Sequence, residues 1–138
     1  MRKIIFRAKR KDTGEWVEGF YVCLGDTFHY ILSGKLDLTR SYVMFKKYEI
    51  NPETLGQYTG ESDKNGNKIF EKDIVKVKLM CSNGEHTTEI TTVDYDENDC
   101  CYSPMDWKES CQWCDYSTSI EEIEIIGNAI DNPDLLTA

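Results

Sequence analysis

Residues 55–79 constrain the fold of this chain more than any other segment. Two short runs of β-forming residues flank the pair Asn65-Gly66, and a third run at 74–79 follows after a brief turn. An Asn-Gly pair readily adopts the positive φ angles of a two-residue hairpin turn, so the first two runs can pair with each other. Apolar residues alternate with lysines along the third run, which gives it one face for a core and one for solvent. The segment therefore predicts short antiparallel strands.

The first fifty residues show a similar strand periodicity. Three runs rich in alternating, aromatic and β-branched residues span positions 3–10, 15–24 and 27–32. Turn residues separate them, and Gly14 can supply the positive φ of a hairpin. In the second run, large apolar side chains share alternate positions: Trp16, Phe20, Val22 and Leu24. With a fourth strand predicted at 42–50, we expect residues 1–54 to form an N-terminal antiparallel β meander.

Residues 55–138 are expected to form a C-terminal domain, a small SH3-like β-barrel. Its predicted strands lie at 57–60, 68–70, 74–79, 87–95 and 119–130. The last of these also fits a helical period, but Gly127 would cost a helix interior about 1 kcal/mol, so we predict a strand. Residues 96–118 have no clean period and are predicted to form a long variable loop, a kind of segment that is often functional. Short helical turns are expected after Pro133 and, as an alternative to a simple turn, at Asn51-Pro52-Glu53.

The size and composition predict a small globular protein of the cytoplasm. The chain has 138 residues, of which 40% are hydrophobic and 12% aromatic, and these values fit a packed core. No apolar run approaches the roughly 20 residues of a membrane span. The basic start lacks the apolar core and cleavage site of a secretory signal. We therefore expect one domain or two small lobes, and no membrane partner.

The charge of the chain is distributed unevenly along it. Residues 1–50 hold ten Lys/Arg against six Asp/Glu and carry +4, whereas residues 51–138 hold six against nineteen and carry −13, which gives a net charge of −9. Halves of opposite sign could attract each other within one molecule or between copies. Alternatively, both are solvated faces that keep the protein soluble. A homo-oligomer is accordingly the first partner that we expect.

Two further partners follow from the same distribution. The first predicted strand is basic and has aromatic neighbours in Phe6 and Trp16, so it could contact nucleic acid. Its basic residues are Arg2, Lys3, Arg7, Lys9, Arg10 and Lys11. The acidic half would be repelled by phosphate, but it could imitate a phosphate backbone and occupy a DNA-binding host protein.

Four of the six cysteines lie close together in the sequence and are candidate zinc ligands. They are Cys100, Cys101, Cys111 and Cys114. Four thiolates can close a tetrahedral zinc site that orders a loop. Against this, adjacent side chains in a strand point to opposite faces, and the surrounding carboxylates raise thiol pKa values. A redox dithiol and inert thiols remain as alternatives, and we expect no bound metal or cofactor.

The remaining polar patterns do not form a catalytic site. Asp63, Asn65 and Asn67 have the spacing that begins a calcium loop, but Lys68 replaces its glycine and Ile74 its final glutamate. A capped Asn-Gly hairpin explains the three residues better. The sequence has only two histidines, and it shows no Ser-His-Asp grouping, no HxxEH-like pair and no glycine-rich phosphate loop. The sequence therefore predicts that the protein is not an enzyme and assigns no catalytic residue.

Several segments in order along the chain resemble the YopX family of phage and prophage proteins. They are Phe6-Arg7-Ala8, the Gly-Glu-Trp-Val-Glu-Gly run at 14–19, residues 51–60, residues 63–66, the Ile-Phe-Glu-Lys-Asp-Ile-Val run at 69–75, residues 123–128 and residues 132–136. One departure is Lys72, where the family usually has glycine. The resemblance implies a β-rich fold with a small C-terminal barrel, occurrence in phages and mobile elements of bacteria, and self-association. It implies no catalytic residue, because the family motif does not define one.

Three hypotheses for function follow from these features. The first is a non-enzymatic phage or prophage accessory protein in the cytoplasm of a bacterial host cell, self-assembling through β edges and complementary charge. The second is a regulator directed at nucleic acid or at a host factor, through the basic strand or the acidic half. The third, a metal-dependent or thiol enzyme, has the least support from the sequence.

Overall fold

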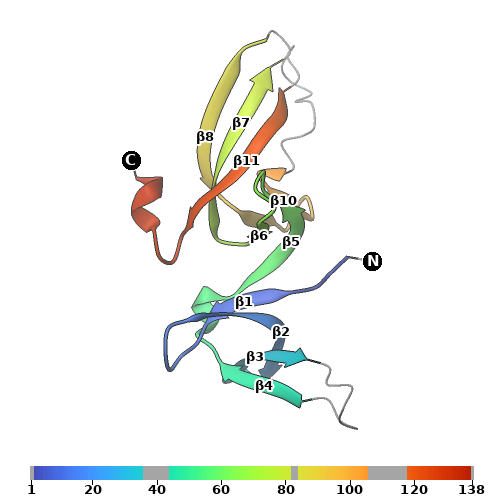
Figure 1. Cartoon of the computed structure of the whole chain (residues 1–138), viewed down its shortest axis with the longest axis vertical. Coiled ribbons are helices and arrows are strands. Elements are labelled where there is room, and N and C mark those ends of the chain that lie inside the picture. The colour runs from blue at the N-terminus through green and yellow to red at the C-terminus, as the bar shows by residue number, and fades with distance from the viewer. Residues whose placement is uncertain (1, 36–43, 82–83, 106–117, 138) are drawn as a thin grey trace. The chain divides into compact units, whose positions relative to one another are not determined.

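The computed structural model of the chain describes residues 2–35, 44–81, 84–105 and 118–137. These residues form β-strands and short 3-10 turns, with no α-helix among them (Figure 1). The chain divides into two compact units, Met1–Tyr58 and Thr59–Ala138. The mainly β class predicted from the sequence is confirmed.

The N-terminal unit is an antiparallel sheet. Its strands are β1 (Phe6–Lys9), β2 (Trp16–Leu24), β3 (Phe28–Lys35), β4 (Met44–Glu49) and the start of β5 (Gly56–Ser62). They lie in the order β4-β3-β2-β1-β5, and β6 (Lys68–Phe70) follows β5 in the same six-stranded sheet. A 3-10 turn, η1 (Pro52–Thr54), begins at Asn51, whose side chain accepts a hydrogen bond from the Glu53 N–H.

One face of this N-terminal sheet carries its small core. Ala8, Ile31 and Ile50 are buried there, and the partly buried Val17 and Tyr21 pack against them. Strand alternation places the neighbouring residues of β2 on the opposite face. The large apolar residues at alternate positions of β2 therefore lie on that outer face. Among them, Phe20 is 61% exposed and Leu24 is 57% exposed.

The C-terminal unit contains two smaller sheets. One has the order β11-β7-β8 and the other the order β10-β9, and all these neighbours are antiparallel. Their strands are β7 (Asp73–Cys81), β8 (His86–Thr92), β9 (Asp94–Asp96), β10 (Cys101–Ser103) and β11 (Thr118–Asn128), and a 3-10 turn, η3 (Pro133–Leu136), follows. The core of this unit comes mainly from β7, through Val75, Val77 and Leu79, together with Ile69 and Val93.

The structure differs from the sequence-based expectation in two respects. The strand pairings of the described residues do not close a barrel: β8 ends its sheet as an edge strand, and β9 pairs with β10 instead of extending that sheet. Second, the single strand predicted at 87–95 is divided, because the buried Val93 bonds through its N–H to the Asp73 carbonyl. The predicted loop at 96–118 begins with the turn into β10, and its residues 106–117 lie outside the described part of the chain.

The ambiguous segment at 119–130 is a strand, as predicted. β11 pairs with β7 over its full length, with register shifts between Ile120 and Glu122 and between Ile125 and Gly127. These irregularities insert extra residues into the strand, which explains why its isoleucines do not follow a simple period of two. The isoleucines Ile120, Ile123 and Ile125 pack against the core of the C-terminal unit.

Candidate functional site

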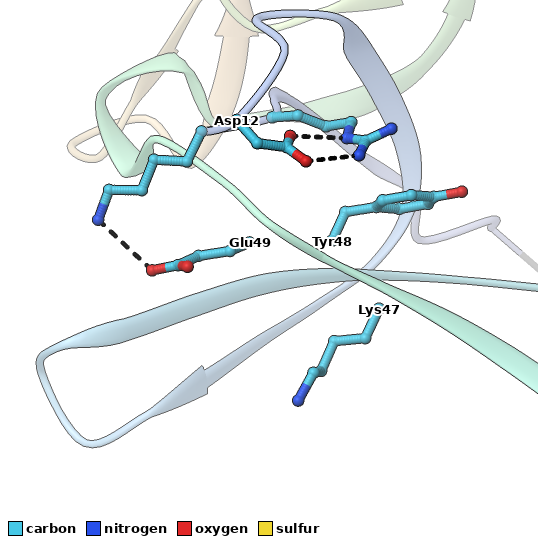
Figure 2. A pocket seen from close by; sticks show the side chains of 6 residues that line it. Asp12, Lys47, Tyr48 and Glu49 are labelled. Atoms are coloured by element: carbon cyan, nitrogen blue, oxygen red, sulfur yellow. Dashed lines mark hydrogen bonds and ion pairs between the residues drawn. The ribbon is translucent and has the colours of Figure 1, made fainter.

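A shallow pocket of about 330 Å³ lies in the N-terminal unit and is lined almost entirely by charged residues (Figure 2). Its residues come from the end of β1 with the following turn, and from the end of β4: Arg10, Lys11, Asp12, Lys47, Tyr48 and Glu49. An antiparallel bridge between Arg10 and Ile50 brings these two segments together. A hydrogen bond from the Lys11 N–H to the Glu49 carbonyl continues this contact.

Four of the five charged residues that line this pocket form ion pairs with each other. The Arg10 guanidinium donates two hydrogen bonds to Asp12, at 3.0 and 2.7 Å, and lies 4.6 Å from the centre of the Tyr48 ring. Lys11 Nζ lies 3.4 Å from Glu49 Oε1. Figure 2 shows the Lys47 side chain extending away from these two ion pairs; its ammonium lies over the ring of Tyr30, at 4.7 Å.

The ion pair with Arg10 makes Asp12 a poor candidate for a general base. The hydrogen bond from Arg10 lowers the pKa of Asp12 below its ordinary value, and the same bond raises the pKa of Arg10. A general base is most effective when its pKa lies near the working pH, and the shift of Asp12 goes the opposite way. The sequence did not point to this pocket, because the bridge that assembles it joins positions 40 residues apart.

The cysteines predicted as zinc ligands are only partly described. Cys100 is exposed and Cys101 half-buried, whereas Cys111 and Cys114 lie outside the described residues. Cys100 has a φ of 53°, and its thiol donates to the Glu97 carbonyl at 3.6 Å. Across residues 2–35, 44–81, 84–105 and 118–137, no group of three or more Cys, His, Asp or Glu side chains could hold a metal ion. The zinc hypothesis stays a prediction.

Asp63, the first residue of the calcium-like spacing, is a structural acceptor. It is buried, with 7% of its surface exposed, and Oδ1 accepts hydrogen bonds from the N–H groups of Asn65 and Asn67. Its second oxygen accepts from the N–H of Ile125 on β11. Burial raises the pKa of Asp63, but these backbone hydrogen bonds outweigh it, so the pKa lies below its ordinary value. The residue closes the hairpin turn, as the capped Asn-Gly interpretation predicts.

The two histidines are each bound to a side chain in their own unit. His29 Nδ1 lies 2.6 Å from the Tyr21 hydroxyl, and the two rings are stacked. His86 Nδ1 lies 3.1 Å from Glu121 Oε2, which Lys78 also approaches at 3.5 Å. Neither histidine has a serine or cysteine hydrogen-bonded to it among the described contacts, so neither forms a nucleophile–base pair there.

Carboxylates of β11 are compensated by neighbouring lysines. Lys64 Nζ lies 3.3 Å from Glu124 and 3.8 Å from Glu122, while Lys78 approaches Glu121. These pairs are partly exposed and contribute little to stability. They do reduce the local negative potential, which weakens the case for imitation of a phosphate backbone at this strand.

The cations of the basic first strand contact an aromatic ring or a carboxylate. The Arg7 guanidinium and the Lys9 ammonium lie over the ring of Trp16, at 4.9 and 5.4 Å, while Arg10 binds Asp12. Arg7 and Lys9 lie on the same face of the sheet as Glu18, which pairs with Arg7 in the register of β1 and β2. The ion pair offsets the charge of Arg10, whereas the contacts with the neutral Trp16 ring leave the charges of Arg7 and Lys9 in place.

β8 is one of the two edge strands of the β11-β7-β8 sheet, and β11 is the other. β8 pairs with β7 on one side, and no described strand pairs with its other side. Its first five residues are exposed, including Ile90 at 50%. η3 contacts β8. An edge strand of this length presents N–H and C=O groups that another chain can pair with.

The pairings and burial define a mainly β protein whose described residues include a charged pocket and an edge strand, β8. Its family follows from comparison with known proteins: the YopX protein family matches residues 5–137, and the chain belongs to that family. No curated protein and no solved structure matches the chain. No helix in the described part of the chain is long and apolar enough to span a membrane.

Proposed function

We propose that this chain is a non-enzymatic accessory protein of a phage or prophage that self-associates in the bacterial cytoplasm. The observation that carries the proposal is the open edge of β8, which can extend its sheet by pairing with a strand of another copy. Such pairing supplies main-chain hydrogen bonds that do not depend on side-chain sequence. The resemblance to YopX proteins supports self-association independently of this edge.

The second part of the proposal is that opposite charges on two copies attract each other. The sequence of the first fifty residues is net positive and the remainder strongly negative. β8 itself carries Glu89, whereas β4, the edge strand of the N-terminal sheet, carries the exposed residues Lys46 and Lys47. An interface between a β4 edge and a β8 edge of two copies would therefore bring opposite charges together.

A role in binding nucleic acid receives less support from the same residues. The net charge of −9 opposes approach to phosphate, and described cations of the first strand contact aromatic rings or carboxylates. An enzymatic role receives less support as well, since the pocket of Figure 2 has its carboxylates paired with cations.

Light scattering coupled to gel filtration tests the proposal. We expect a mass well above the 16.0 kDa of one chain at about 0.1 M NaCl, and a smaller mass at about 1 M, where the Debye length falls from roughly 10 to 3 Å. A monomer at both salt concentrations, or an oligomer whose mass does not respond to salt, would contradict it.

A charge reversal at the edge makes the test specific to β8. Glu89→Lys places a lysine on the edge strand, a feature by which natural sheets resist pairing, so we expect the low-salt mass to fall. Glu97→Lys makes the same charge change on an exposed turn between β9 and β10 and should leave the mass unchanged. Equal effects of both variants would mean that net charge, and not the β8 edge, governs association.

A further inference from the structure

The outer face of the β2–β3 hairpin is an exposed apolar surface on the N-terminal unit. The register pairs Phe20 with Leu32, Val22 with Tyr30 and Leu24 with Phe28, so all six side chains share one face. Phe20, Leu24 and Phe28 are 61%, 57% and 50% exposed. Large apolar residues that gather in this way on a small protein mark an interaction surface.

The face has a projection at one end and a hollow at the other. Leu24 and Phe28 flank the turn at the hairpin tip, where they project from the sheet. A hollow of about 240 Å³ lies further along the face, and it is more apolar in its lining than the pocket of Figure 2. Its lining residues are Ile4, Ile5, Glu18, Gly19, Phe20, Leu32, Ser33 and Gly34. A cavity of roughly 150 Å³ already accepts benzene, so this hollow can receive one aromatic or leucine side chain.

Charged residues of opposite sign lie at the two ends of this face. Asp26 is exposed at the hairpin tip, beside the projection. Lys9 and Arg7 lie at the other end, opposite Trp16 and Glu18 in the register of β1 and β2. Two copies can be placed face to face and related by a twofold rotation that turns one end for end. The hairpin tip of each copy then meets the hollow of the other. The same rotation would bring Asp26 to the Lys9 end.

We propose that a second copy of this chain docks on the outer face of the β2–β3 hairpin, with Leu24 and Phe28 of each copy entering the hollow beside Phe20 of the other. The proposal rests on the self-association proposed above and names a surface for it. An isologous contact needs a face that is complementary to itself, and this face pairs projection with hollow and Asp26 with Lys9. Its charges of both signs and its apolar side chains fit a protein better than a uniformly anionic nucleic acid.

Because the centre of this contact is apolar, it should persist where charge attraction is screened. Sedimentation equilibrium of the full chain at about 1 M NaCl is therefore expected to show a dimer. Phe28→Asp places a charge in the partner's hollow and should raise the dimer dissociation constant at least about tenfold. Leu136→Asp is the matched control, since Leu136 is 42% exposed but lies on η3 of the C-terminal unit, and it should leave the dimer intact.

A charge swap tests the twofold register, and it is measured at about 0.1 M NaCl, where charges are less screened. Asp26→Lys should weaken the dimer, and adding Lys9→Glu to it should restore the affinity, because the opposite charges then meet again across the axis. Gly34→Leu, which narrows the hollow without touching the projection, should weaken the dimer as Phe28→Asp does. Circular dichroism on each variant verifies that its fold is retained.

The outcomes separate this inference from the broader proposal. A wild-type oligomer that Phe28→Asp and Gly34→Leu both leave unchanged would overturn the docking surface while self-association through β8 survives. A wild-type monomer at all salt concentrations would overturn both. Binding of a labelled single-stranded DNA that Phe28→Asp abolishes, in a protein that stays monomeric, would assign the face to nucleic acid and overturn the proposal.

Discussion

The buried carboxylate of Asp63 accepts a hydrogen bond at 3.2 Å from the backbone N–H of Ile125, a residue 62 positions later. The same side chain closes the Asn65-Gly66 turn through two further backbone N–H groups. One carboxylate thus fixes the hairpin after β5 and attaches it to β11. A backbone hydrogen bond from the Lys64 N–H to the Ile123 carbonyl supports the same junction.

Replacing Asp63 should destabilise the C-terminal unit. Asp63→Ala leaves three backbone N–H groups without their acceptor, and loss of a buried charged acceptor costs roughly 2–3 kcal/mol in the free energy of unfolding. Asp63→Asn keeps one carbonyl oxygen and should cost less. Urea denaturation followed by tryptophan fluorescence and circular dichroism measures both; a loss for Asp63→Ala below about 0.5 kcal/mol would contradict this role.

The same carboxylate should make stability depend on acidic pH. Because its pKa is lower in the folded protein than the ordinary value of 3.8, its contribution is present above that value and is lost as the pH falls through the folded pKa. We therefore expect the urea midpoint to decline below about pH 4. Asp63→Asn should show a shallower decline over that range, and parallel curves for the two proteins would show that other groups cause it.

Lys72 occupies a backbone conformation that favours glycine. Its φ is 71°, its N–H donates to the Val93 carbonyl, and its carbonyl accepts from the Ala129 N–H. Lys72→Gly removes the cost of the left-handed conformation, so we expect the free energy of unfolding to rise by up to about 1 kcal/mol. Lys72→Ala keeps that conformation and should give no gain. Equal stability of all three proteins in thermal unfolding would argue against backbone strain at this turn.

Gly19 is required for a different reason, the close approach of β2 and β3. A Cβ atom added there would collide with the Leu32 carbonyl and approach the Ile31 side chain at 3.1 Å. Gly19→Ala should therefore destabilise the N-terminal unit by roughly 1–3 kcal/mol. Gly14→Asn is the control: Gly14 has a φ of 72° but nothing within 4 Å of its Cβ position, and asparagine tolerates that conformation. Chemical denaturation should separate the two variants clearly.

Removal of metal tests whether the cysteines at 100, 101, 111 and 114 bind zinc. A structural zinc site contributes directly to folding, so chelation would lower the unfolding temperature. We expect substoichiometric zinc in protein purified without added metal, and no change in unfolding temperature with a chelator. One zinc ion per chain together with destabilisation by the chelator would instead establish the zinc site.

Much of the strand content follows from local sequence. Gly14 and Gly66 adopt positive φ angles of 72° and 83° at the predicted turns, because few other residues reach that conformation at low cost. Short-range periodicity also predicts β7, whose buried and exposed residues alternate over most of its length. The YopX resemblance spans both units and depends on those same turns and strands. Each of these features is set by residues close together in the chain.

The candidate sites could not be predicted from local sequence, because contacts between distant segments assemble them. The charged pocket requires the bridge between Arg10 and Ile50, and β8 is an edge strand because the distant β11 pairs with the other side of β7. The sequence could not indicate either, since pairing between distant segments depends on the whole sheet. For the same reason, the sequence could not establish whether the predicted SH3-like barrel closes. The described strand pairings do not close it.

The alternating pattern of β2 shows most directly what the sequence determined and what it left open. The sequence established a strand with apolar side chains on both faces, so periodicity alone could not select the buried one. The tertiary structure buries the face of Val17 and Tyr21, because Ala8 and Ile31 from neighbouring strands pack there. It thereby leaves Phe20 and Leu24 exposed, since each strand can place only one of its faces against a single small core.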